Sequence, residues 1–306
     1  MATNDRSVNR GTVGHATTGG LTLAWADAPL GLRSAPFGEH VGSGTLRDVV
    51  LEATSGDPSF LLISEDADTR AWSAGATVRP PIAERGAVGM GLGLALAGRR
   101  VLVTVAGPGR LGAVAEVLAE ASAIADLDEF AVPLVVHVAH GREAGPREDQ
   151  PLYVVWPGVR LWFPYDAATT AHAARVGLSG RRPCVVFEPR AGGPVDVPER
   201  DGRHVVLVAF GSAVAAAAEA SQVLSAEGID AAVVIAPSLP VDVASIAERV
   251  RGCGRFVVVH PDEPMLAAGV REALTEACFL YLESPPATAK GHLDDVVRAA
   301  RAAVHY

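Results

Sequence analysis

The chain has 306 residues, enough to bury a large core and, at the usual domain size, to form two domains. Its formal net charge is -9, which excludes a protein that holds nucleic acid by charge alone. The three cysteines are far apart in the chain and form no CxxC pair, so we expect reduced thiols in a cytoplasmic protein. The first 22 residues are polar, unlike a signal peptide, and the longest apolar run is too short to cross a bilayer.

Residues 1–43 are rich in Gly, Thr, Asn and Arg and predict a loosely ordered N-terminal arm. After this arm, helical patterns alternate with short apolar runs that are typical of buried strands. The predicted strands are 59–64, 101–106, 131–139, 159–164 and 184–188, and the predicted helices are 45–53, 87–97, 111–124 and 167–178. This alternation predicts a parallel sheet that is covered by helices on both faces.

A stretch rich in Pro, Gly and charge, residues 191–203, then predicts a linker. A second alternating pattern follows it, with strands over 205–210, 231–236 and 255–260 and helices ending at 226, 250, 278 and 304. The fold class expected from the sequence is therefore α/β with two doubly wound sheet domains, residues 44–190 and 204–306.

The stretch from Pro80 to Gly98 contains an acid, Glu84, just before a long uncharged run of Ala, Val, Gly, Met and Leu. Such a run suits a helix that is buried on all sides. Three glycines in it weaken an isolated helix, and their use would be close approach to another helix or to a ligand. Glu84 is then either a first-turn acid stabilised by the helix dipole or a carboxylate placed for chemistry.

Other candidates are weaker. The glycines Gly89, Gly91 and Gly93 lie inside an apolar run and not at a strand-to-helix turn, which argues against a dinucleotide loop. No spacing of Cys and His suits a metal, so we expect no metal ligands in this chain. His137 alternates with apolar residues and is more typical of a core histidine. His140, at the exit of the same strand, is either a plain loop histidine or a reagent.

Together these segments resemble the beta subunits of 2-oxo-acid dehydrogenase E1 components, in the transketolase-like group of thiamine-diphosphate enzymes. The similarity lies in P-P-I-A-E-R-G-A-V-G-M-G-L-G-L-A-L-A-G-R-R-V from residue 80, P-G-V-R-L-W-F-P-Y-D-A from 157, P-C-V-V-F-E-P-R from 183 and H-V-V-L-V-A-F-G-S from 204. The motifs occur in the family's order over roughly residues 45–280. The resemblance implies a pyrimidine-binding domain followed by a transketolase C-terminal domain.

The resemblance also implies a role for two residues. In this family the acid of the P-I-A-E turn, here Glu84, contacts the aminopyrimidine ring of thiamine diphosphate and promotes loss of the thiazolium C2 proton. The cofactor then serves as electron sink while a carboxylate or a C–C bond departs. Ile82 matches the residue whose side chain supports the bent cofactor.

The family's G-D-G…N motif, which holds Mg²⁺ and the diphosphate, does not occur in this sequence. In the family it resides on an alpha subunit, so the resemblance implies an E1-alpha-like partner, usually in an α2β2 assembly. The active site would then lie between the subunits, and both Mg²⁺ and diphosphate ligands would come from the partner.

Three departures from the family bear on the reaction. The segment between Glu65 and Pro80 is short, and residues 106–111 lack the aromatic that relatives place against the pyrimidine. The loop after Gly141 lacks the H-S-Q whose histidine assists acyl transfer to lipoamide. Either His140 takes over this proton transfer or the acceptor is not lipoamide.

These observations leave three hypotheses. The first is an E1-beta-like subunit that cleaves a 2-oxo acid or a ketose and passes the two-carbon unit to an unusual acceptor, such as a ketone, a sugar or an acyl carrier protein, in specialised bacterial metabolism. The second is an ordinary 2-oxo-acid dehydrogenase E1 beta subunit that acylates lipoyl-E2. The third is a catalytically silent partner of an active alpha subunit.

Overall fold

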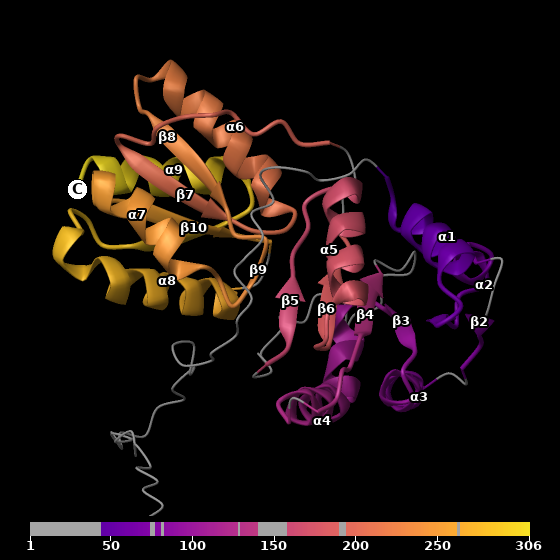
Figure 1. Cartoon of the computed structure of the whole chain (residues 1–306). Coiled ribbons are helices and arrows are strands. Elements are labelled where there is room, and N and C mark those ends of the chain that lie inside the picture. Colours follow the sequence, from indigo (N-terminus) through magenta and orange to yellow (C-terminus); the bar gives the residue numbers. More distant parts are fainter. Residues whose placement is uncertain are drawn as a thin grey trace, which may run out of the picture.

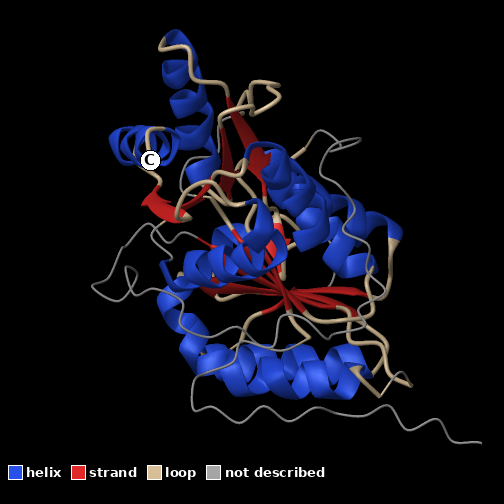
Figure 2. Cartoon of the chain, turned by 90° about the vertical axis from the view of Figure 1, so that its left-hand side faces the viewer, coloured by secondary structure: helices blue, strands red, loops and turns tan. Residues whose placement is uncertain are grey.

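A computed structural model describes residues 44–73, 77–80, 83–127, 129–139, 158–189, 194–261 and 264–306. The arm predicted for residues 1–43 lies outside them. Two sheets with helices on both faces form the fold, which confirms the expected α/β class with two doubly wound domains (Figures 1 and 2).

The larger sheet has seven strands in the order β2-β1-β3-β4-β6-β5-β9. All its neighbouring strands are parallel except β5 and β9. The strands are β1 (Phe60–Ile63), β2 (Thr77–Val78), β3 (Arg100–Ala106), β4 (Leu134–Ala139), β5 (Arg160–Trp162), β6 (Cys184–Phe187) and β9 (Ser238–Leu239).

Helices cover both faces of this sheet. One face packs against α1 (Leu46–Gly56) and α5 (Ala167–Ser179), and the other packs against α3 (Glu84–Leu96) and α4 (Ala115–Ala125). A short helix, α2 (Ala67–Arg70), follows β1. The helix predicted over 111–124 instead begins as the 3-10 helix η1 (Pro108–Val114), because the Gly107-Pro108-Gly109 turn tightens the chain before α4 starts.

The smaller sheet is parallel throughout, in the order β11-β10-β7-β8. Helices α6 and α9 pack on one of its faces, and α7 and α8 pack on the other. The elements are β7 (Val205–Ala209), α6 (Ala213–Ala226), β8 (Ala231–Ile235), α7 (Val243–Cys253), β10 (Phe256–His260), α8 (Pro264–Cys278), η2 (Phe279–Tyr281), β11 (Ala287–Lys290) and α9 (Leu293–Val304).

Local capping explains where two helices of the first domain begin. The Thr45 hydroxyl accepts the Asp48 N–H while the Asp48 carboxylate accepts the Thr45 N–H, which forms a capping box at α1. Asp166 and Thr169 form the same arrangement at α5. These two helix starts agree with the prediction from sequence.

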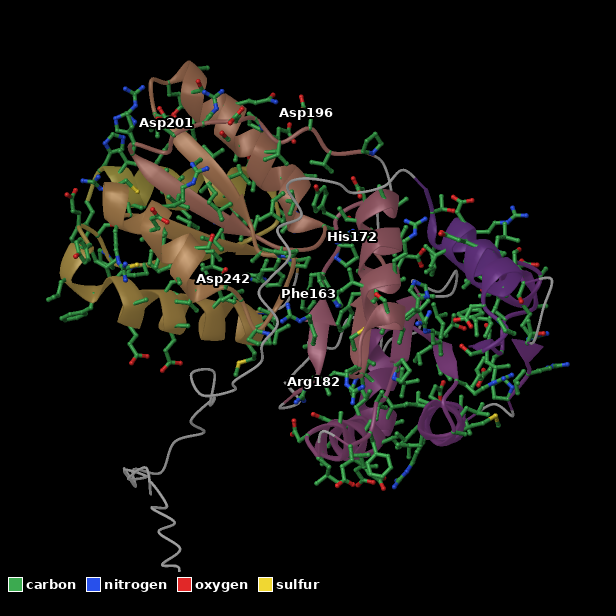
Figure 3. All side chains as sticks on the ribbon, in the orientation of Figure 1. Phe163, His172, Arg182, Asp196, Asp201 and Asp242 are labelled. Atoms are coloured by element: carbon green, nitrogen blue, oxygen red, sulfur yellow. The ribbon has the colours of Figure 1, made fainter. Side chains whose placement is uncertain are left out.

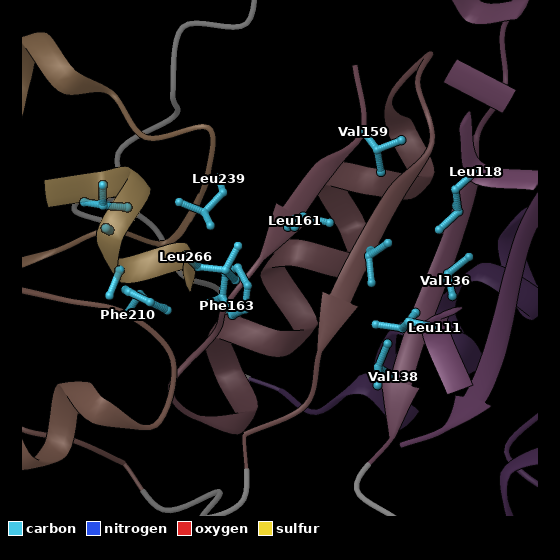
Figure 4. Close-up of a cluster of buried hydrophobic side chains, with 14 of the residues drawn as sticks. Leu111, Leu118, Val136, Val138, Val159, Leu161, Phe163, Phe210, Leu239 and Leu266 are labelled. Atoms are coloured by element: carbon cyan, nitrogen blue, oxygen red, sulfur yellow. The ribbon is translucent and has the colours of Figure 1, made fainter. Parts of the chain in front are cut away.

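The two domains share a core. Strand β9, from the second half of the chain, pairs antiparallel with β5 and so extends the first sheet. Phe163, just after β5, stacks on Phe187 with ring centroids 4.7 Å apart and meets the edge of Phe210 at 5.3 Å. Figure 4 shows Phe163 beside Phe210 and Leu266 of the second domain. Apolar burial therefore joins the domains across the 191–203 segment.

Helix α3 is buried on one side only, so the expectation of a helix buried all round was wrong for this chain. Ala87, Val88 and Leu92 face the sheet, whereas Met90 and Leu96 are 38% and 40% exposed. A uniformly apolar sequence could not indicate which side the chain itself covers. Among the described residues, no helix is long and apolar enough to cross a membrane.

The glycines of α3 differ in their surroundings. A Cβ on Gly91 would lie 2.8 Å from Val103 Cγ2 and 3.0 Å from Leu134 Cδ1, both in the buried core. A Cβ on Gly89 or Gly93 would have no described atom within 4 Å. Gly91 therefore permits close approach of α3 to the sheet, whereas Gly89 and Gly93 have no such role toward the described residues.

Replacing Phe163 by Ala should destabilise the chain by about 3–5 kcal/mol, because it removes the ring that joins the two domains. The free energy of unfolding, measured from denaturant curves, tests this. Phe279→Ala is the matched control, since Phe279 is 71% exposed and its loss should cost less than about 0.5 kcal/mol. An equal loss of unfolding free energy in the two variants would contradict a core shared by the two domains.

Gly91→Ala should destabilise the isolated chain by about 1–3 kcal/mol, because the new methyl group overpacks the core. Gly93→Ala should instead stabilise it by about 0.5–1 kcal/mol, because alanine loses less backbone entropy in a helix. Thermal melting of both variants in parallel is the measurement. A stable Gly91→Ala chain would show that α3 does not approach the sheet as described.

Candidate functional site

Glu84 lies at the edge of the large sheet where the parallel strands end, which we call the carboxyl edge. Helix α3 leads from the end of β2 back to the start of β3, so its first residue is at this edge. Helix α4 leads from the end of β3, through η1, back to β4, which places Glu116 of its first turn at the same edge. Open α/β sheets bind their ligands at such an edge.

Glu84 has the position of a first-turn helix acid, one of the two roles considered from the sequence. It is the first residue of α3, where the helix dipole favours a carboxylate. Glu84 is half-buried, so its carboxylate is neither fully solvated nor enclosed in the core. The preceding Ala83 is the N-cap and provides no side-chain hydrogen bond. A dipole-stabilised, partly shielded acid at a ligand-binding edge can also exchange a proton or a hydrogen bond with a ligand.

An ion pair joins the first turns of the two helices at this edge. Arg85 Nη2 lies 2.5 Å from Glu116 Oε2, and the two side chains are 65% and 75% exposed. Arg85 directly follows Glu84, so a cation and two carboxylates lie in adjoining turns. Sequence reasoning missed this pair, because nothing in the spacing of residues 85 and 116 shows that the two helices start side by side.

Two of the predicted site residues, Ile82 and His140, lie outside the described residues. Among the described residues, Gly107 at the end of β3 has a φ of +83°, and its N–H donates to the Ala139 carbonyl at 2.8 Å. This bond ties the ends of β3 and β4 together. Where relatives are expected to have an aromatic, Leu111 of η1 is fully buried.

A row of polar side chains crosses the sheet near the same edge, on the face of α1 and α5. The Thr104 hydroxyl donates to the Ser64 hydroxyl at 2.5 Å, and Thr104 is the register partner of His137. His137 is only 2% exposed, and its Nε2 lies 3.9 Å from Oε2 of Glu188, whose side chain is 39% exposed. His137 is thus a core histidine beside a partly solvated carboxylate.

The sequence carried a signal for part of this row. The ends of two strands, V-L-V-T-V-A in β3 and L-V-V-H-V-A in β4, each place one polar residue third from the strand end. These residues are Thr104 in β3 and His137 in β4. Parallel strands in register bring such positions together. Ser64 and Glu188 follow their strands and had no comparable signal.

Other titratable groups have structural roles. Asp66 caps α2, and its hydrogen bonds from Thr69 lower the pKa of the carboxyl. Glu148 and Asp149 lie outside the described residues. His172 on α5 (Figure 3) has a pKa lowered by burial and by Arg175. All three cysteines are free and buried, and burial raises the pKa of Cys184 to about 12.

The described part of the site offers one acid to a ligand. Glu84 is half-buried at the carboxyl edge; its carboxyl group, when protonated, can donate a hydrogen bond to a ring nitrogen of an aminopyrimidine and, when ionised, can accept one from the amino group. Within the described ranges, no three His, Cys, Asp or Glu side chains are grouped as metal ligands would be. The described residues therefore fit a pyrimidine group and offer no set of ligands for a metal.

Comparison with known proteins agrees with this geometry. The family model for the transketolase pyrimidine-binding domain matches residues 40–194, and that for the transketolase C-terminal domain matches residues 195–304. The pyruvate dehydrogenase E1 component subunit beta-2 of Oryza sativa subsp. japonica is 25% identical over 343 residues, which covers 93% of this chain and 91% of the rice protein.

The pyruvate dehydrogenase E1 beta subunit of Rhizobium meliloti is also 25% identical, over 70% of this chain, and the match spans only 52% of that protein. A solved structure described as a split-gene transketolase, an inactive beta4 tetramer, superposes with a TM-score of 0.68. It is 21% identical, covers 85% of this chain and 96% of its own, and shows the fold. The chain thus belongs to the transketolase family, with a pyrimidine-binding and a C-terminal domain similar to those of pyruvate dehydrogenase E1 beta subunits.

Proposed function

We propose that this chain is the beta-like subunit of a two-subunit thiamine-diphosphate enzyme. The assembled enzyme cleaves a 2-oxo acid or a ketose and transfers the two-carbon unit to an acceptor. The observation that carries the proposal is the position of Glu84, a half-buried acid at the start of α3, in a chain that matches the pyrimidine-binding family. The boundaries 44–190 and 204–306 remain our proposal for the two domains.

Glu84 is the catalytic residue in this proposal. Its carboxyl group would bind the aminopyrimidine ring of the cofactor and would hold or accept a proton there. When bound, thiamine diphosphate supplies an electron sink for bond cleavage next to a carbonyl. The sheet-facing side of α3 keeps water from one side of Glu84, since Ala87 and Val88, one helical turn after it, are buried. Ile82 would support the cofactor from the preceding turn.

A partner subunit is part of the proposal. The sequence has no G-D-G…N stretch, so the ligands for Mg²⁺ and the diphosphate would come from an E1-alpha-like chain in an α2β2 assembly. The exposed apolar side of α3, with Met90 and Leu96, supports a contact there, because exposed apolar groups on one helix gain free energy when a partner covers them.

Two features bear on the acceptor in this function. The pyruvate dehydrogenase relatives favour lipoyl-E2 as acceptor, whereas the short loop without H-S-Q favours a different one, such as an aldehyde, a sugar or an acyl carrier. With lipoyl-E2 as acceptor, His140 would have to donate the proton in acyl transfer. The changed loop also supports a role in specialised metabolism.

Glu84→Gln tests the function in the enzyme co-expressed with its G-D-G…N partner, with thiamine diphosphate, Mg²⁺ and either pyruvate or a ketose. We expect the cleavage rate to fall by roughly 10²–10⁴-fold, the usual effect of removing a proton-transfer group. Glu272→Gln, on the outer side of α8, is the matched control and should keep the rate. Undiminished turnover in Glu84→Gln would favour a catalytically silent subunit instead.

The acceptor is tested by adding lipoamide and, separately, an aldehyde to the active enzyme. If lipoamide is used, His140→Gln should lower acyl transfer while leaving decarboxylation unchanged, because only the second step needs that proton. If the aldehyde is used, a carboligation product forms and lipoamide stays oxidised. Acyl transfer that is insensitive to His140→Gln would remove His140 from the mechanism.

A further inference from the structure

The first turn of α3 is weakly determined by its own sequence. Its N-cap, Ala83, gives no side-chain hydrogen bond, and Gly86 in the same turn is exposed. An uncapped start costs about 0.5–2 kcal/mol relative to Ser, Thr, Asp or Asn, and glycine adds about 1 kcal/mol relative to alanine. Glu84 therefore sits on the part of the helix whose backbone needs outside support.

Arg85 supplies a contact from this turn to a second helix. A cation in the first turn is unfavourable to the helix dipole, so Arg85 does not help α3 to form. Its guanidinium instead reaches α4, where Glu116 occupies the first turn and is favoured by that dipole. The 2.5 Å separation of Nη2 and Oε2 is that of a direct charge-assisted hydrogen bond.

We propose that Arg85 and Glu116 are positioning residues for Glu84. Their ion pair fixes the first turn of α3 against the first turn of α4, and this sets the direction of the Glu84 carboxylate at the carboxyl edge. The inference rests on the proposed function, because it assigns the pair a role in the work of Glu84.

A positioning role and a structural role predict different changes in folding stability and in cleavage rate when the pair is broken. An exposed ion pair contributes about 0–1 kcal/mol to folding, and this pair is 65% and 75% exposed. A displacement of a reacting group by about 1 Å can cost roughly 10²-fold in rate. Breaking the pair should therefore hardly change stability while it lowers the rate of cleavage clearly.

The experiment compares Arg85→Gln, Glu116→Gln and the reversed pair Arg85→Glu with Glu116→Arg, all in the enzyme assembled with its partner. We expect each single variant to lower kcat by about 10-fold or more, with KM changed much less. The reversed pair should regain most of the lost kcat, since its charges are again opposite. In the isolated chain, where the pair is exposed, the melting temperature should shift by no more than about 2 °C.

Arg301→Gln is the matched control, because Arg301 also forms an exposed ion pair between two elements, with Glu227 in the second domain. It should leave kcat unchanged. The inference is overturned if the single variants keep the wild-type kcat, or if the reversed pair stays as slow as they are. It is also overturned if the variants fail to assemble by size-exclusion chromatography, which would make the pair a subunit contact.

These outcomes differ from failure of the proposed function. If Glu84→Gln turns over like the wild type, the function itself is wrong. If Glu84→Gln is inactive while the pair variants are fully active, the function stands and only the positioning role is lost.

Discussion

The strands of the large sheet, apart from β9, run in one direction, and the site depends on this constraint. A helix that connects two parallel neighbours must start at the end of one strand and return to the start of the next. Glu84, Arg85 and Glu116 are therefore brought to one edge from positions 31 residues apart in the chain, counting from 85 to 116. The polar row of Ser64, Thr104 and His137 reaches the same edge for the same reason.

Helix α3 shows how this constraint is met by a sequence that is poor at forming a helix. Glycines at four of its thirteen positions would leave it mostly unfolded alone, because short helices are marginal in water even with good helix formers. Packing against β3 and β4 compensates for this low helix propensity, and Gly91 allows the helix to pack closely against the sheet. The helix is thus stable where it touches the sheet and weak at its first turn, which carries the acid.

The sequence predicted those features that have local causes. Thr45 and Asp166 mark helix starts because their side chains bond the first-turn amides. The strands β3, β4 and β7 are mostly apolar runs. Strand β9 was missed, since two residues that pair antiparallel with a strand of the other domain leave no periodic signal. The one-sided burial of α3 was missed because every residue from 87 to 97 is apolar or glycine.

The same distinction between local and tertiary causes applies to the residues of the candidate site. Glu84 could be assigned from its motif, whereas the partner of Arg85 depends on how two helices pack, which no local pattern encodes. Likewise Thr104 and His137 could be matched by their place in two strands. Glu188 could not, because its contact with His137 is diagonal across the sheet and begins after β6 has ended.

In the proposed function the site is divided between two subunits, and its electrostatics would then depend on what covers the carboxyl edge. In the chain alone, Arg85 and Glu116 are largely exposed and Glu84 is half-buried, so water screens their charges. A partner that covers the edge lowers the effective dielectric, and the same charges then interact several times more strongly. Covering also removes the water that competes for the Glu84 carboxylate. Assembly can therefore activate Glu84 with no change in the fold of this chain, which is a physical reason for a site shared between two subunits.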